Sequence, residues 1–145
     1  MIALTLVERL DGWSLPLAGC PVISLCVDFA LTLNVDHPAG AVAVRIEEPF
    51  VFVAPSGTEV LLSPEEDPAG LGPVLTCSRT QVHDLIAYTD GGLEVSFSDG
   101  ATIRVPSSEE FEAWQLAGPD GLKIVSVPGG ELTIWGRAPA ESARD

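Results

Sequence analysis

Basic residues are scarce in this chain of 145 residues. It has seven Lys and Arg against 21 Asp and Glu, which gives a formal net charge of −14 at pH 7, and Lys123 is its only lysine. Proteins that bind nucleic acid neutralise phosphates with basic surfaces, and anionic membranes attract basic segments. The charge therefore argues against a nucleic-acid partner and against binding to a membrane surface.

Cysteine is also scarce, and long uninterrupted apolar runs are missing. Cys20, Cys26 and Cys77 make an odd number with no CxxC spacing, which argues against a disulfide framework and against a zinc site. The segment Leu17–Cys20 looks like a lipoprotein cleavage box, but charged residues interrupt the apolar stretch that a signal peptide needs before it. We expect a soluble cytoplasmic protein whose cysteines are reduced and buried.

Residue patterns that carry catalysis are absent. His37 and His83 are the only histidines; His37 lies in a turn-like segment, and His83 is followed by Asp84, whose side chain would face the opposite side of a strand. We expect both histidines at the surface or at a sheet edge, with no metal. No Gly-x-Ser-x-Gly elbow, Walker loop or dinucleotide fingerprint is present. The sequence therefore predicts a protein that is not an enzyme and has no catalytic residue, cofactor or metal.

Long amphipathic helical patterns are missing too. Short apolar runs are separated by Gly, Pro, Asp and Asn, which is typical of strands and turns. Strands are predicted over Val22–Asp28, Ala30–Val35, Ala41–Glu47, Phe50–Ala54, Glu59–Leu62, Val82–Thr89, Leu93–Ser98, Thr102–Pro106, Ala113–Ala117, Leu122–Val127 and Glu131–Trp135.

One or two short helices complete the prediction. Asp67 is a good N-cap and Pro68 suits the first helical position, after which Leu71, Val74 and Leu75 fall on one face. The segment Ser107–Glu110 offers a capping box and one further helical turn.

The two halves of the chain resemble each other. Apolar and turn residues of residues 12–66 recur in residues 72–136 at offsets of 59 to 64 positions. The matching pieces are Val22 and Leu25 with Val82 and Leu85, Val44–Ile46 with Ile103–Val105, Phe50 and Phe52 with Trp114 and Leu116, and Pro55-x-Gly57 and Pro64 with Pro119-x-Gly121 and Pro128.

Neither half alone would bury enough surface, so we expect both to share one core. The predicted fold is mainly β: an internal duplication whose two antiparallel halves pack as a sandwich or a partly open barrel. It forms a single domain over residues 1–137, with a flexible tail at residues 138–145.

Three tryptophans supply large apolar surfaces. Packing in the core is the expectation for Trp13 and Trp114, and Trp135 is the best candidate for an exposed one because it lies near the end of the ordered chain. A tryptophan-lined ligand pocket is the alternative.

Several blocks resemble a family of short actinobacterial proteins known only as a domain of unknown function. The resemblance covers Trp13 to Trp135, and Phe111 stands where tyrosine is expected more often. It implies no activity, cofactor or catalytic residue. Its blocks are Val27-Asp28-x-x-Leu31-x-Leu33, Leu93-x-Val95-x-Phe97-x-Asp99-Gly100, Phe111-x-Ala113-Trp114, Gly118-Pro119-x-Gly121 and Pro128-Gly129-Gly130-x-Leu132-x-x-Trp135.

The acidic charge, together with the missing catalytic patterns, favours a protein–protein interaction module with a basic partner. Immunity-type inhibitors of bacterial toxins are similar in size and charge, which is an analogy only. The alternatives are a sandwich or barrel that binds a small molecule, an enzyme that uses carboxylates alone, and a self-assembling structural module such as a homodimer. The candidate interface residues are Glu65, Glu66, Asp67, Glu109, Glu110 and Trp135.

Overall fold

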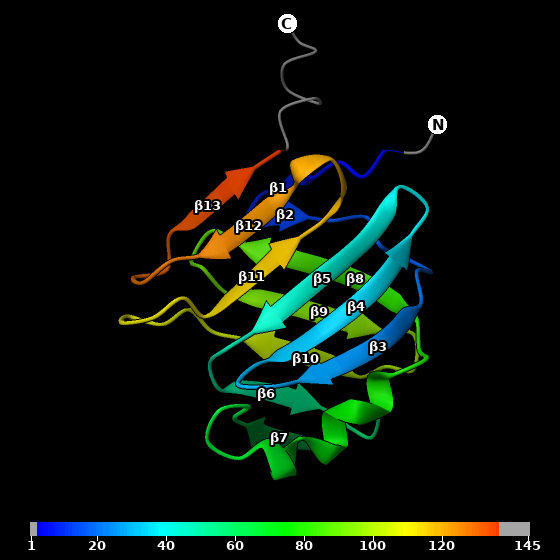
Figure 1. Cartoon of the computed structure of the whole chain (residues 1–145), viewed down its shortest axis with the longest axis vertical. Coiled ribbons are helices and arrows are strands. Elements are labelled where there is room, and N and C mark those ends of the chain that lie inside the picture. Colours follow the sequence, from blue (N-terminus) through cyan, green and yellow to red (C-terminus); the bar gives the residue numbers. More distant parts are fainter. Residues whose placement is uncertain (1–2, 137–145) are drawn as a thin grey trace, which may run out of the picture.

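The computed structural model describes residues 3–136, which form two antiparallel β-sheets packed face to face (Figure 1). Across these residues 48% of the chain is strand and the sheets do not close into a barrel. One sheet has the strand order β1 (Val7–Arg9), β2 (Gly12–Ser14), β8 (Val82–Tyr88), β9 (Leu93–Phe97), β10 (Thr102–Val105), β6 (Phe50–Val53) and β7 (Glu59–Leu62). The other has the order β13 (Leu132–Trp135), β12 (Lys123–Ser126), β11 (Trp114–Ala117), β5 (Gly40–Ile46), β4 (Leu31–His37) and β3 (Val22–Val27).

Alternation of buried and exposed residues along the strands builds the core. On β9, Leu93, Val95 and Phe97 are buried, whereas the residues between them are not. Trp114 and Phe50, the largest fully buried side chains, lie on β11 and β6. The predicted mainly β sandwich is thus confirmed, and each of the predicted strands is present. The short strands β1 and β2 were missed, because three residues give too little pattern to recognise.

One of the two helix predictions is confirmed. The helix expected after Asp67 is present as the 3-10 helix η1 (Pro68–Cys77), with Leu71 and Val74 buried, although Leu75 is 41% exposed and the Asp67 side chain makes no capping hydrogen bond. The second helix prediction is wrong, since no helical turn forms at Ser107–Glu110. The Ser108 hydroxyl accepts hydrogen bonds from the backbone N–H groups of Glu110 and Phe111, at 3.3 and 3.2 Å, as a helix N-cap would, but its carbonyl accepts the Gly129 N–H and the segment stays a loop.

Two further expectations were wrong. His37 is the last residue of β4 and only 8% exposed, because the alternation that buries Val35 also turns His37 inward. Cys26 is exposed because it lies on the outer face of the edge strand β3, whereas Cys20 and Cys77 are buried as expected. His83 is exposed, as predicted. The predicted tail at residues 138–145 lies outside the described residues.

The halves repeat each other in strand order. Strands β3–β5 form a meander in one sheet, after which β6 and β7 cross to the other; β8–β10 and then β11–β13 do the same in the opposite direction. Val22 donates its backbone N–H to the Thr80 carbonyl, and 60 positions later Val82 donates to the Cys20 carbonyl, both at 2.8 Å. Register shifts occur at matching places, between Val22 and Ser24 and between Val82 and Asp84. Descent of the two halves from one duplicated segment stays a prediction.

One turn ties the two sheets together. The Gly91 carbonyl, between β8 and β9, accepts hydrogen bonds from Trp114 Nε1 at 2.9 Å and from Ser126 Oγ at 2.8 Å, and both donors belong to the opposite sheet. Gly91 also lies directly against Gly130, since a Cβ atom on Gly91 would overlap the Gly130 carbonyl oxygen. Two glycine backbones therefore meet where no side chain fits.

This contact predicts that alanine substitutions at two glycines with the same φ will lower the free energy of unfolding by different amounts. Gly91 and Gly57 both have φ +94°, but a Cβ on Gly57 would have open space around it. We expect Gly57→Ala to lower the free energy of unfolding by about 1 kcal/mol through backbone strain. Gly91→Ala should cost about 3 kcal/mol or more, because overlap is added to the strain. Urea unfolding of both variants measures the difference, and equal losses would show that Gly130 moves aside easily.

Candidate functional site

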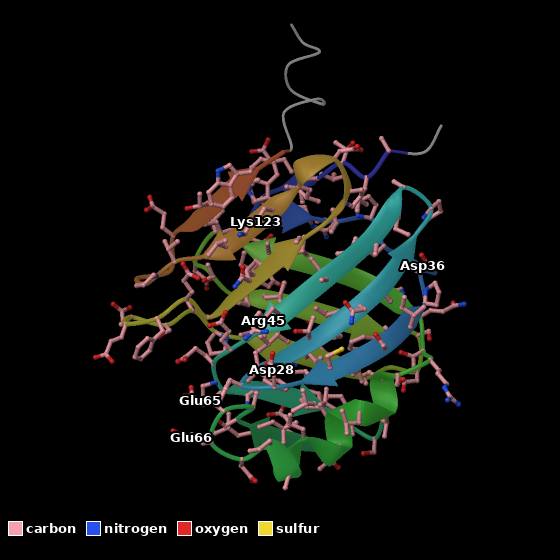
Figure 2. All side chains as sticks on the ribbon, in the orientation of Figure 1. Asp28, Asp36, Arg45, Glu65, Glu66 and Lys123 are labelled. Carbon is pink, nitrogen blue, oxygen red and sulfur yellow. The ribbon has the colours of Figure 1, made fainter. Side chains whose placement is uncertain are left out.

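A hollow of about 230 Å³ lies at one end of the sandwich, where four connections meet. We call it the acidic hollow. Figure 2 shows Asp28 and Arg45 near the middle of the view and Glu65 and Glu66 below and to the left of them. Its lining residues are Phe29, Arg45, Glu47, Glu48, Glu65 and Phe111.

Two phenylalanines stand at the hollow because their loops turn them outward. Asp28 accepts a hydrogen bond from the Ala30 N–H through Oδ1 at 2.8 Å, and this tight turn between β3 and β4 leaves Phe29 76% exposed. Phe111 is 57% exposed and follows the Ser108 turn in the connection from β10 to β11. Apolar rings therefore face solvent beside carboxylates.

Arg45 is the basic residue of the hollow, and its charge is already engaged. It lies on β5 and forms ion pairs with Asp28 at 3.2 Å and with Glu47 at 3.5 Å. Hydrogen bonds from the Ala30 backbone and from Arg45 hold the pKa of Asp28 below its usual value. Gln115 Nε2 donates to Glu47 at 3.0 Å and fixes that carboxylate further.

The other carboxylates of this end lack such partners. Within residues 3–136, Glu48, Glu65 and Glu66 form no ion pair with a basic side chain. Burial, together with the charges of Glu65, Glu47 and Glu66, raises the pKa of Glu48, and a hydrogen bond with Ser108 offsets part of that rise. The fold thus holds negative charges together at a cost in free energy, and a cation placed in the hollow would reduce that cost.

The predicted interface residues are brought together only in part. Glu65 lines the hollow, and Glu66 lies close enough to influence the pKa of Glu48. Asp67 follows them along the chain, and Glu109 and Glu110 directly precede Phe111; all three are exposed. The sequence analysis did not identify five of the lining residues as site residues: Phe29, Arg45, Glu47, Glu48 and Phe111. A feature of the sequence that could have indicated this site is Phe29, a large apolar residue in the short connection between two predicted strands.

The three tryptophans have different environments, none of them in the acidic hollow. Trp114 is fully buried, as expected. Trp135 is 50% exposed on β13, and the Lys123 ammonium lies 6.0 Å from the centre of its ring, which is within cation–π distance. Trp13 is half-buried and lines a separate hollow of about 400 Å³ with Leu132 and Ile134.

The comparisons give one match. The sequence model of a family of unknown function, DUF6188, matches residues 13–136. Neither the search of curated proteins nor the search of solved structures finds a match. Within residues 3–136, no helix has the length and apolar character needed to span a membrane.

The raised pKa of Glu48 predicts how stability depends on pH. The folded state binds its proton more tightly than the unfolded state does, so the ionised carboxylate destabilises the fold above the ordinary pKa of 4.5. Glu48→Gln should therefore raise the free energy of unfolding at neutral pH by up to about 1 kcal/mol, the magnitude expected for a partly screened group. The gain should shrink as the pH falls through the raised pKa, because the wild-type residue then becomes neutral as well.

Urea unfolding at a series of pH values measures this effect. Glu8→Gln is the matched control, since Glu8 is an exposed residue of β1 outside the hollow and the change of charge is the same. A loss of stability in Glu48→Gln at neutral pH would contradict the repulsion between the carboxylates.

Proposed function

The chain belongs to the DUF6188 family, whose function is unknown, and we propose that it is a protein–protein interaction module that docks a basic segment of its partner in the acidic hollow. The observation that carries the proposal is the group of carboxylates without basic partners between two exposed phenylalanines. An immunity-type inhibitor of a basic partner is one protein of this kind.

A lysine or arginine side chain suits the chemistry of the hollow. Its aliphatic stem would pack on the rings of Phe29 and Phe111, and its charge would lie near Glu48 and Glu65. A cation there would also lower the pKa of Glu48, so binding would release a proton in the range where Glu48 titrates. The net charge of −14 would speed the approach of a basic partner at low salt.

Acid–base catalysis by carboxylates is the second candidate, because Glu48 and Glu65 line one hollow and the pKa of Glu48 is raised. The size of the hollow favours docking over catalysis. Its volume of about 230 Å³ is below the roughly 300–1,000 Å³ of most small-molecule sites, and it suits the end of one side chain.

The proposal includes a cytoplasmic location. Its support is that Cys20, Cys26 and Cys77 are all free thiols, which persist in a reducing compartment.

A salt-dependent capture experiment tests the docking proposal. The tagged chain is incubated with lysate of its source organism at about 50 mM and about 500 mM salt, since screening shortens the range of exposed charges. We expect a basic protein to be retained at low salt and lost at high salt. Its affinity for the purified chain should fall about 5-fold or more in the double variant Glu48→Gln/Glu65→Gln, and also in Phe29→Ser/Phe111→Ser.

The matched control is Glu8→Gln/Glu131→Gln, which removes the same charge away from the acidic hollow and should change the affinity little beyond long-range steering. Equal losses in both glutamine pairs would show that net charge alone attracts the partner. No enriched protein at either salt would contradict the docking proposal.

A further inference from the structure

Another hollow, larger than the acidic one, lies on the other side of the molecule. Its volume is about 680 Å³, and it forms where the connection from β2 to β3 passes the turn between β4 and β5. Figure 2 shows Asp36, one of its residues, on the opposite side of the molecule from Glu65 and Glu66. We call it the histidine hollow. Its main lining residues are Pro16, Cys20, Pro21, Asp36, His37 and Pro38.

His37 brings an unused hydrogen-bond donor to this hollow. Its side chain is only 8% exposed, and its Nδ1 accepts a hydrogen bond from the Ala39 backbone N–H at 2.9 Å. Because Nδ1 is the acceptor, the neutral ring carries its hydrogen on Nε2. No group of residues 3–136 accepts a hydrogen bond from that Nε2–H. A donor without a partner in the described chain, on a residue that lines a hollow, can bond an acceptor from outside the chain, either water or the oxygen of a ligand.

The other residues that line the histidine hollow determine which ligand charge it favours. The three prolines provide rigid apolar surface, and Asp36 is the one charged residue among the lining side chains, so an anion is disfavoured. Burial and the neighbouring Asp36 raise the pKa of the Cys20 thiol, so it stays neutral at physiological pH. The volume falls within the range of about 300–1,000 Å³ typical of small-molecule sites.

We propose that the histidine hollow binds a small organic amide or ketone without negative charge, whose carbonyl oxygen accepts a hydrogen bond from Nε2 of His37. An apolar part of the ligand packs against the prolines. This site is independent of the acidic hollow, so it does not depend on the proposed docking function.

The matching position in the other half of the chain indicates a substitution that would fill part of the histidine hollow. Gly19 has φ +83°, and a Cβ on it would point into open space. The matching position 60 residues later is Arg79, which carries a side chain at φ +72°. A side chain is therefore compatible with this backbone geometry, and asparagine tolerates it well. Gly19→Asn should fill part of the hollow while the fold stays intact.

Three ligands of nearly equal shape test the proposal. Benzamide is neutral and has a carbonyl oxygen, benzoate is an anion, and benzamidine is a cation without an acceptor oxygen. Titration of the labelled whole chain, followed by NMR of backbone amides and of the His37 ring nitrogens, reports where each ligand binds. We expect benzamide to shift the signals of His37, Cys20 and Gly19 with a Kd of about 1 mM, the weak affinity usual for so small a molecule.

The variants separate a true site from weak surface contact. Gly19→Asn and His37→Phe should each weaken benzamide binding about 5-fold or more, whereas Cys26→Ser, on the exposed face of β3, should leave it unchanged. Backbone amide spectra confirm that each variant is folded. Binding of benzoate or of benzamidine as strong as that of benzamide would overturn the proposal, as would benzamide binding that His37→Phe leaves intact. No shift with any ligand at about 10 mM would show that Nε2 of His37 needs only water.

Discussion

The close contact between Gly91 and Gly130 is the constraint on which the arrangement of the sheets depends. Apolar side chains hold the sheets together without fixing a direction, because the hydrophobic effect is non-directional. The Gly91 carbonyl adds direction, since it accepts hydrogen bonds from Trp114 and Ser126 of the facing sheet. Trp114 and Gly130 belong to the sequence blocks that resemble the family, so those blocks contain residues that form this contact. Membership of the family therefore says more about the fold of this chain than about its function.

The fold was largely predictable because it depends on local patterns. Alternating apolar residues, such as those of β9, identify a half-buried strand without knowledge of its partner. The wrong predictions concern residues whose local sequence is compatible with two different structures. Ser108 could begin a helix or close a loop turn, and only contacts from outside the segment decide between them, including the hydrogen bond from the Gly129 N–H to the Ser108 carbonyl. His37 was misplaced because a proline after it suggested a turn, whereas β4 extends up to it.

The candidate site was less predictable, since it joins residues from connections far apart in sequence. The pair Glu65 and Glu66 is visible as a run of charge, but nothing local shows that Glu48 lies close enough for its pKa to rise. The crossing of β6 and β7 to the opposite sheet creates this proximity, and it brings the connections before β6 and after β7 to one end of the sandwich. The histidine hollow has a similar origin, because two connections meet there and His37 is turned inward by β4.

The acidic hollow and the histidine hollow share one physical property: each contains polar groups that have no complementary partner within the described chain. At the first, carboxylates repel one another without a basic partner; at the second, a buried N–H has no acceptor within residues 3–136. A sequence selected for stability alone would avoid both the repulsion between carboxylates and the unpaired N–H group. Such locally unfavourable features are expected at functional sites. The two groups call for different ligands, a cation at Glu48 and an acceptor oxygen at His37. Because the hollows lie on opposite sides of the molecule, the two proposed binding events would not exclude each other.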